Sequence, residues 1–117
     1  MDNSLPTNVA PLELNERINK DSFDPFFIDV REDEELHIAP FTYPVKHLPL
    51  SKSSMWIKNI HDELPKDRSI VVICHSGIRS LNFATWLIEQ GWISEVFNLV
   101  GGIDEWSQDV DQSIARY

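Results

Sequence analysis

The sequence predicts an α/β domain built around a mainly parallel sheet, and three observations lead to this prediction. Apolar runs of strand length alternate with amphipathic stretches of helix length along the chain. The run from Ser69 to Cys74 contains four β-branched residues in succession, as expected of a strand at the centre of a parallel sheet. With 117 residues, of which 42% are hydrophobic, the chain is long enough for one domain with a buried core.

The first half of the chain is divided by prolines. Pro11 suits the first position of a helix, and Ser51 can cap one. The predicted elements are, in order, a short edge strand at 9–10, a helix over 11–20, a buried strand over 25–30, a helical turn at 32–36, an extended loop over 39–49 that contains a short strand at 45–48, and a helix over 51–61.

The second half is divided mainly by glycines. Its predicted elements are a turn at 64–67, the central strand at 69–74, a largely covered helix over 78–90, a strand at 96–99, a glycine turn at 101–102 and a short helix over 103–108. We expect one domain over 1–117, with its motif-bearing core at about 9–107 and a polar tail at 108–117.

The charge balance narrows the choice of partners. Nineteen acidic residues against ten basic ones give a net charge of −9. Such a surface disfavours binding to nucleic acid or to anionic lipid, since both need clustered cations. The sequence has no apolar run of about 18 residues and no signal-peptide pattern, so we expect a cytoplasmic protein that does not enter the membrane.

The single cysteine, Cys74, excludes an intrachain disulfide and any metal site built from several cysteines. No histidine shows ligand spacing with it, so we expect no metal. Cys74 ends the predicted central strand, and ligands of parallel α/β folds bind beyond the carboxyl ends of strands.

The loop Cys74-His75-Ser76-Gly77-Ile78-Arg79-Ser80 has the composition of an anion-binding site. The first backbone N–H groups of the helix that follows have no helical partners, so they can converge on an anion, and a thiolate placed there is stabilised as a nucleophile. Gly77 permits backbone conformations closed to other residues, and the planar guanidinium of Arg79 suits an oxyanion. Ser76 and Ser80 could bond the sulfur or cap the helix. The alternative is that Cys74 is only a buried residue in an ordinary crossover.

Three further segments accompany this loop in a fixed order: Asp29-Val30-Arg31, His47-Leu48-Pro49-Leu50, and Gly101-Gly102 followed by Trp106. Together with the cysteine loop they resemble the rhodanese superfamily, in its single-domain thiosulfate sulfurtransferase form. The resemblance covers about residues 9–107. It implies a three-layer α/β fold in which helices flank a mainly parallel sheet of five strands.

The resemblance also implies a reaction. Cys74 would take the outer sulfur of a donor such as thiosulfate, hold it as a persulfide and pass it to cyanide or a thiol, without metal or cofactor. Arg79 would orient the donor. The substrate-binding loop residues would be His75, Ser76, Gly77, Ile78 and Ser80.

Supporting roles follow from the same resemblance. Asp29 and Arg31 would be structural, as a strand-end carboxylate and a partly buried ion pair, and Trp106 would anchor the core beneath the glycine turn. The partners would be a small sulfur donor or a persulfide-carrying protein, together with a thiol acceptor. The protein would be a monomer or a homodimer.

Two other functions stay open. Tyrosine-phosphatase-type enzymes place five residues between cysteine and arginine, whereas four separate Cys74 from Arg79, so a phosphatase or arsenate reductase is disfavoured. A rhodanese-like module that only binds a partner is disfavoured by the intact Cys74 and Arg79. The segment 36–48 departs from the usual family pattern, and we expect Phe41 and Tyr43 to line the mouth of the site.

Overall fold

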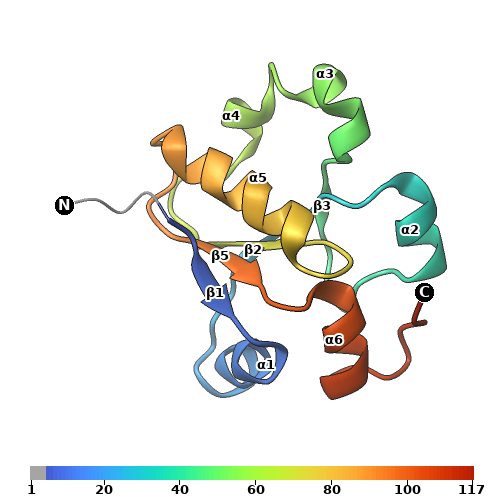
Figure 1. Cartoon of the computed structure of the whole chain (residues 1–117). Helices are drawn as coiled ribbons and strands as arrows, with labels where there is room; N and C mark the ends of the chain where they lie inside the picture. The colour runs from blue at the N-terminus through green and yellow to red at the C-terminus, as the bar shows by residue number, and fades with distance from the viewer. Residues whose placement is uncertain (1–4) are drawn as a thin grey trace.

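All strand pairings in the sheet are parallel, and the central position belongs to the strand that precedes Cys74. The computed structural model describes residues 5–117 (Figure 1). Its strands are β1 (Thr7–Val9), β2 (Phe26–Asp29), β3 (Lys46–His47), β4 (Ile70–Ile73) and β5 (Val96–Leu99), in the spatial order β1-β5-β4-β2-β3. The prediction of an α/β fold with a mainly parallel five-stranded sheet is confirmed.

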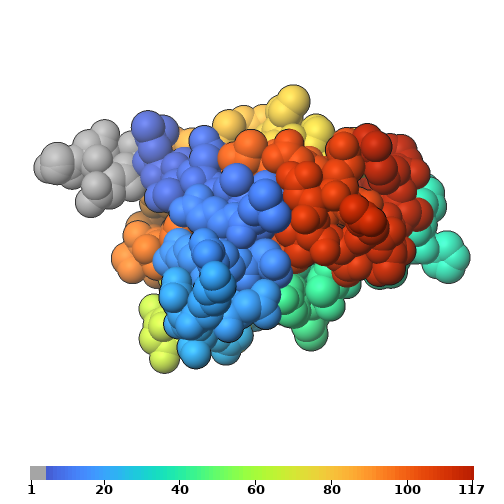
Figure 2. Space-filling view, turned by 90° about the horizontal axis from the view of Figure 1, so that it is seen from below, coloured from blue at the N-terminus to red at the C-terminus, as the bar shows by residue number. Residues whose placement is uncertain are grey.

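Helices connect the strands and cover both faces of the sheet. They are α1 (Pro11–Lys20), α2 (Asp33–Ile38), the 3₁₀ turn η1 (Leu50–Lys52), α3 (Ser53–Trp56), α4 (Ile60–Glu63), α5 (Ile78–Glu89) and α6 (Gly102–Asp109). Figure 1 shows α5 on one face, with α3 and α4 beyond it, and α1 and α6 on the other. Figure 2 views the second face, where α1 and the α6 region form the surface.

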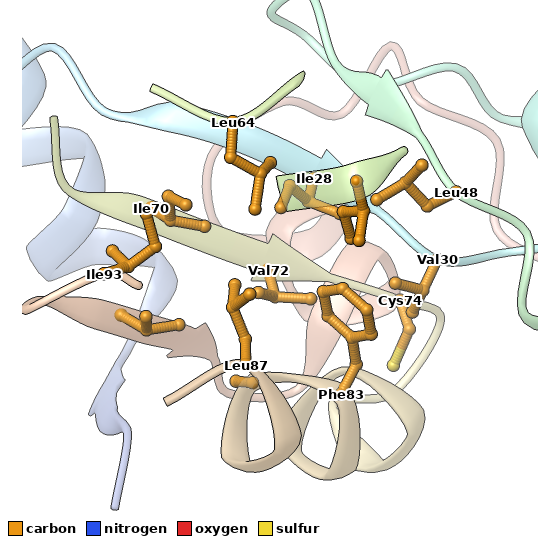
Figure 3. Close-up of a cluster of buried hydrophobic side chains, with 13 residues drawn as sticks. Ile28, Val30, Leu48, Leu64, Ile70, Val72, Cys74, Phe83, Leu87 and Ile93 are labelled. Atoms are coloured by element: carbon orange, nitrogen blue, oxygen red, sulfur yellow. The ribbon is translucent and has the colours of Figure 1, made fainter. Parts of the chain in front are cut away.

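The alternation of side chains along β4 divides the core into two clusters. Ile70 and Val72 point to the α5 face, whereas Val71 and Ile73 point to the α1 and α6 face. All four are fully buried, which explains why the sequence is apolar at every position of this strand. Cys74 continues the first set and lies in the cluster under α5 (Figure 3).

The prediction of one continuous helix over 51–61 is wrong. The chain forms η1, α3 and α4 instead, with a turn at 57–59 between the last two. The backbone N–H of Asn59 bonds the carbonyl of Trp56, a tighter spacing than in an α-helix. This change of direction lets Ile60 enter the core completely.

The segment 108–117, predicted only as a polar tail, packs against the domain. Ile114 is buried in the α6-side cluster, and the Ser107 hydroxyl donates to the Ile114 carbonyl at 2.6 Å. The chain then passes beside α2 (Figure 1), where Tyr117 contacts residues near the cysteine loop. Within residues 5–117, no helix is both long and apolar enough to cross a bilayer.

Candidate active site

The sulfur of Cys74 is held by the backbone of the loop that follows β4. Its Sγ accepts hydrogen bonds from the N–H groups of Gly77, at 3.1 Å, and Ser80, at 3.3 Å. Gly77 has φ +96°, and a Cβ at this position would lie 3.0 Å from the nitrogen of Gly101. The loop therefore needs glycine here for its backbone conformation as well as for space.

The carbonyl side of the same loop rests on the start of α6. The N–H of Ile103 donates to the Cys74 carbonyl at 2.8 Å, and the N–H of Asp104 donates to the His75 carbonyl at 3.0 Å. Gly102 has φ +58°, and a Cβ there would overlap the Cys74 carbonyl oxygen and lie 2.5 Å from that of His75. The glycine turn thus lets a helix terminus approach and orient the cysteine loop.

A buried polar chain extends from the sulfur toward β5. Cys74 Sγ donates to Ser80 Oγ at 3.2 Å, and the Ser80 hydroxyl donates to Asn98 Oδ1 at 2.6 Å. Asn98 Nδ2 donates in turn to the Gly77 carbonyl at 3.2 Å. The sequence analysis did not assign Asn98 to the site. The available signal was a polar residue inside an otherwise apolar strand, since a buried amide needs partners.

Arg79 is paired with a carboxylate from α2. Its Nη1 and Nη2 atoms lie 2.7 Å and 2.9 Å from the two carboxylate oxygens of Glu35, in a bidentate arrangement. The hydrogen bond from Arg79 holds the pKa of Glu35 at about 2, well below its ordinary value. Sequence reasoning did not identify Glu35 as a member of the site. In the structure the predicted anion-binding guanidinium is already neutralised by it.

Asp29 and Arg31 form a fully buried ion pair at the end of β2. Arg31 Nε and Nη2 donate to the two carboxylate oxygens of Asp29 at 3.0 Å and 2.8 Å, and Asp29 also accepts the Arg31 backbone N–H. The pair is more deeply buried than the sequence analysis expected. Arg31 Nη1 additionally donates to the hydroxyl of Tyr117 at 3.0 Å.

Tyr117 joins the ion pair to Glu35 and to the cysteine loop. Its hydroxyl donates to Glu35 Oε2 at 3.0 Å, and the centroid of its ring lies 4.3 Å from the centroid of the His75 ring. Burial raises the pKa of the Tyr117 phenol to about 12, so this hydroxyl keeps its proton at neutral pH. Nδ1 of His75 is buried and has no hydrogen-bond partner within residues 5–117, which leaves it available to a group that enters the site.

The other predicted loop residues differ in exposure. Ser80 is buried against the sulfur, whereas Ser76 is exposed and Ile78 exposes 69% of its surface. Within the described residues, no three His, Cys, Asp or Glu side chains are grouped so that they could hold a metal ion.

Trp106 is fully buried on the α6 side, where its Nε1 donates to Thr42 Oγ1 at 2.9 Å. Phe41 packs on Trp106 at 5.1 Å between ring centroids, and Tyr43 stacks on Phe27 at 5.6 Å. The expectation that Phe41 and Tyr43 line the mouth of the site is therefore wrong. Their rings cover Trp106 and Phe27 on the face opposite α5.

The structure is an α/β domain with a parallel sheet, and backbone N–H groups bind the cysteine sulfur at the end of the central strand. The model of the rhodanese-like domain family matches residues 10–109. The chain belongs to this family.

Individual proteins with similar sequences point to the same family. The chain is 35% identical over 98 residues to the putative sulfurtransferase YtwF of Bacillus subtilis, covering 84% of this chain and 87% of that protein. It is 37% identical over 108 residues to the rhodanese-like/PpiC domain-containing protein 12 of Arabidopsis thaliana, covering 87% of this chain but only 36% of that protein.

The fold has counterparts among solved structures. A rhodanese-like domain protein from Staphylococcus aureus superimposes with a TM-score of 0.72 at 22% identity, covering 95% of this chain and 98% of that one. The sequence relatives support a sulfurtransferase kind of function, and the structural likeness concerns the fold.

Proposed function

We propose that this protein transfers sulfane sulfur from a donor such as thiosulfate, or a persulfide on another protein, to a thiol, with Cys74 as the sulfur carrier. The observation that carries this proposal is the convergence of the Gly77 and Ser80 N–H groups on the Cys74 sulfur. These donors favour negative charge on the sulfur, and they remain in place to favour it on a persulfide.

The transfer has two steps. In the first, the Cys74 thiolate attacks the outer sulfur of thiosulfate, the S–S bond of the donor breaks, and sulfite leaves with the bonding electron pair. In the second, an acceptor thiolate attacks the outer sulfur of the Cys74 persulfide and releases the Cys74 thiolate. Cys74 is the only cysteine among these 117 residues, so the acceptor thiol lies outside them.

The remaining residues act through position and charge. Glu35 and the oxyanion of the donor compete for the same side of the Arg79 guanidinium. Arg79 therefore binds the donor only after its bonds to Glu35 break. Asp29 and Arg31 stabilise the strand end beneath the loop. Because Cys74 is fully buried, side chains at the surface of the loop must move before a donor reaches the sulfur.

Steady-state kinetics test the proposal. With thiosulfate and cyanide we expect thiocyanate to form with parallel double-reciprocal lines, as a covalent intermediate requires. Cys74→Ser should abolish the reaction, whereas Glu89→Gln, at an exposed position at the end of α5, should retain it. Thiocyanate formation that persists in Cys74→Ser would contradict the proposal, and Cys74-dependent hydrolysis of an aryl phosphate without sulfur transfer would favour a phosphatase.

A further inference from the structure

The carboxylate of Glu35 is held by two independent sets of donors. Arg79 binds both of its oxygens, at 2.7 Å and 2.9 Å. In addition, Oε1 accepts the backbone N–H of Glu32 at 3.0 Å, and Oε2 accepts the hydroxyl of Tyr117 at 3.0 Å. Each carboxylate oxygen therefore keeps one hydrogen-bond donor when the guanidinium moves away.

The hydroxyl of Tyr117 is oriented toward Glu35 by a buried cation. Arg31 Nη1 donates to this hydroxyl at 3.0 Å, and a guanidinium has no acceptor, so the proton of the hydroxyl is directed to Glu35 Oε2. Arg31 is itself fixed by its fully buried ion pair with Asp29. A charged donor polarises the hydroxyl and strengthens the hydrogen bond that the hydroxyl gives in turn. The buried ion pair thus supports the donor that Tyr117 offers to Glu35.

The packing of the C-terminal segment determines the position of Tyr117. Ile114 is buried, and Arg116 forms an ion pair with Asp104 of α6 at 2.9 Å. The Tyr117 ring packs on the ring of His75, with 4.3 Å between the two centroids. Figure 1 shows that the last residues of the chain lie beside α2. Because these contacts do not involve the hydroxyl, its removal should leave the ring in place.

Binding of a donor changes the partner of Arg79. In the structure the guanidinium faces Glu35, so an oxyanion has to take the place of that carboxylate. The Glu35 side chain is only 18% exposed, and water therefore cannot fully replace the lost bonds. A carboxylate in such a position is costly to leave without donors. The release of Arg79 thus depends on the donors that Glu35 keeps.

We propose that Tyr117 is a positioning residue for sulfur transfer: its hydroxyl retains the Glu35 carboxylate while Arg79 turns to the oxyanion of the donor. This inference rests on the proposed function and adds a residue to it. Tyr117 acts through Glu35 and takes no part in the bonds that form and break at sulfur. It determines how readily Arg79 becomes available to the donor.

Removal of the hydroxyl has two effects of the same sign. Oε2 of Glu35 then has no donor from residues 5–117 once Arg79 leaves, which favours the paired state over the separated one. The carboxylate is also less restrained, so it can follow the guanidinium and continue to compete with the donor. Tyr117→Phe should therefore weaken the binding of an anionic donor. A tyrosine that only locked Glu35 onto Arg79 would give the opposite result.

Single-turnover formation of the persulfide with thiosulfate tests this sign. Tyr117→Phe should raise the half-saturating concentration of thiosulfate about fivefold, as expected for part of one hydrogen bond to a charged group, and keep the limiting rate within about twofold. The control is Tyr43→Phe, at the other tyrosine of the sequence, whose ring packs on Phe27 in the α6-side cluster. The control should change neither quantity. A lower or an unchanged half-saturating concentration in Tyr117→Phe would overturn the proposal.

A double-mutant cycle separates positioning from a structural effect. In the Glu35→Gln background no carboxylate at this position competes for Arg79, so Tyr117→Phe should change the half-saturating concentration by less than about twofold. The same fivefold change in both backgrounds would show that Tyr117 does not act through Glu35, and would contradict the proposal.

Thiosulfate binding tests the same claim without sulfur transfer. In a Cys74→Ser background, an NMR titration with thiosulfate can follow the side-chain N–H signal of Arg79. The dissociation constant should be about fivefold higher when Tyr117→Phe is added. This difference, together with no persulfide in the wild type, would refute the proposed function and support the role of Tyr117 in anion binding. Equal dissociation constants, or no response of the Arg79 signal, would refute the role of Tyr117 itself.

Discussion

Substitution of Gly102 by alanine should damage the cysteine loop, and Gly91 offers a matched control. Both glycines have a positive φ, of +58° and +78°, so alanine is strained at either position. A Cβ at Gly91 would meet nothing within 4 Å, whereas at Gly102 it would overlap the backbone of the loop. The difference between the two variants therefore isolates the contact between α6 and the loop.

The magnitude follows from these contacts. Left-handed backbone costs alanine about 1–2 kcal/mol, and this is the whole effect that we expect for Gly91→Ala. In Gly102→Ala, α6 must also move away from the loop. This movement breaks the bonds from Ile103 N–H and Asp104 N–H to the loop carbonyls, each worth about 1 kcal/mol. We expect a loss of about 3–4 kcal/mol in the free energy of unfolding for Gly102→Ala.

Urea denaturation followed by tryptophan fluorescence measures both losses. Gly102→Ala should also form the persulfide much more slowly under conditions in which the variant is fully folded. The reason is that the backbone N–H groups of the cysteine loop are displaced. Gly91→Ala should retain the wild-type rate. Equal losses of stability in the two variants, or a normal rate in Gly102→Ala, would refute the reasoning.

Three further outcomes are expected. Asp29→Asn should lower the free energy of unfolding by about 3–5 kcal/mol, because it leaves the buried Arg31 without a counter-charge. The control Asp24→Asn, at a carboxylate that is 90% exposed, should lower it by less than about 0.5 kcal/mol. Similar urea midpoints for the two variants would contradict this expectation. Glu35 has its pKa lowered from 4.5 to about 2 by Arg79, so its stabilisation is complete above a pH of about 4.5 and is lost as the pH falls toward about 2. Urea midpoints measured across this window should therefore fall less steeply for Glu35→Gln than for the wild type. Arg79→Ala should keep a cooperative thermal transition and lower the rate with thiosulfate by at least tenfold, and a collapse of the transition would instead mark Arg79 as structural.

The sheet could be predicted because local sequence determines it. Four adjacent apolar β-branched residues leave β4 only a doubly covered position, and the alternation with helical stretches requires parallel connections. The turn at Gly101 and Gly102 could likewise be predicted, because the conformational freedom of glycine is visible in the sequence, whereas its contact with the cysteine loop depends on the tertiary fold.

The partners of the site could not be predicted in the same way. Glu35 and Arg79 are 44 positions apart, and Tyr117 and Glu35 are 82 apart, so only the tertiary fold brings them together. In the sequence, Glu35 is one of several residues in the helical turn predicted at 32–36. The structure shows that it closes the capping box of α2 with Glu32, which orients it at the helix start within reach of Arg79.

The packing of the aromatic residues in segment 36–48 could not be predicted for a different reason. A loop with prolines and exposed polar neighbours gives no periodic signal, so the face on which Phe41 and Tyr43 pack cannot be predicted from position alone. Their contacts with Trp106 and Phe27 are determined by the shape of the α6-side core.

Intact-protein and peptide mass spectrometry after reaction with thiosulfate tests the central claim most directly. The proposed transfer predicts a gain of about 32 Da, one sulfur atom, located on the peptide that contains Cys74 and removed by an added thiol. The same treatment of Cys74→Ser should add no mass. No gain in the wild type, or the same gain in Cys74→Ser, would contradict Cys74 as the carrier of the transferred sulfur.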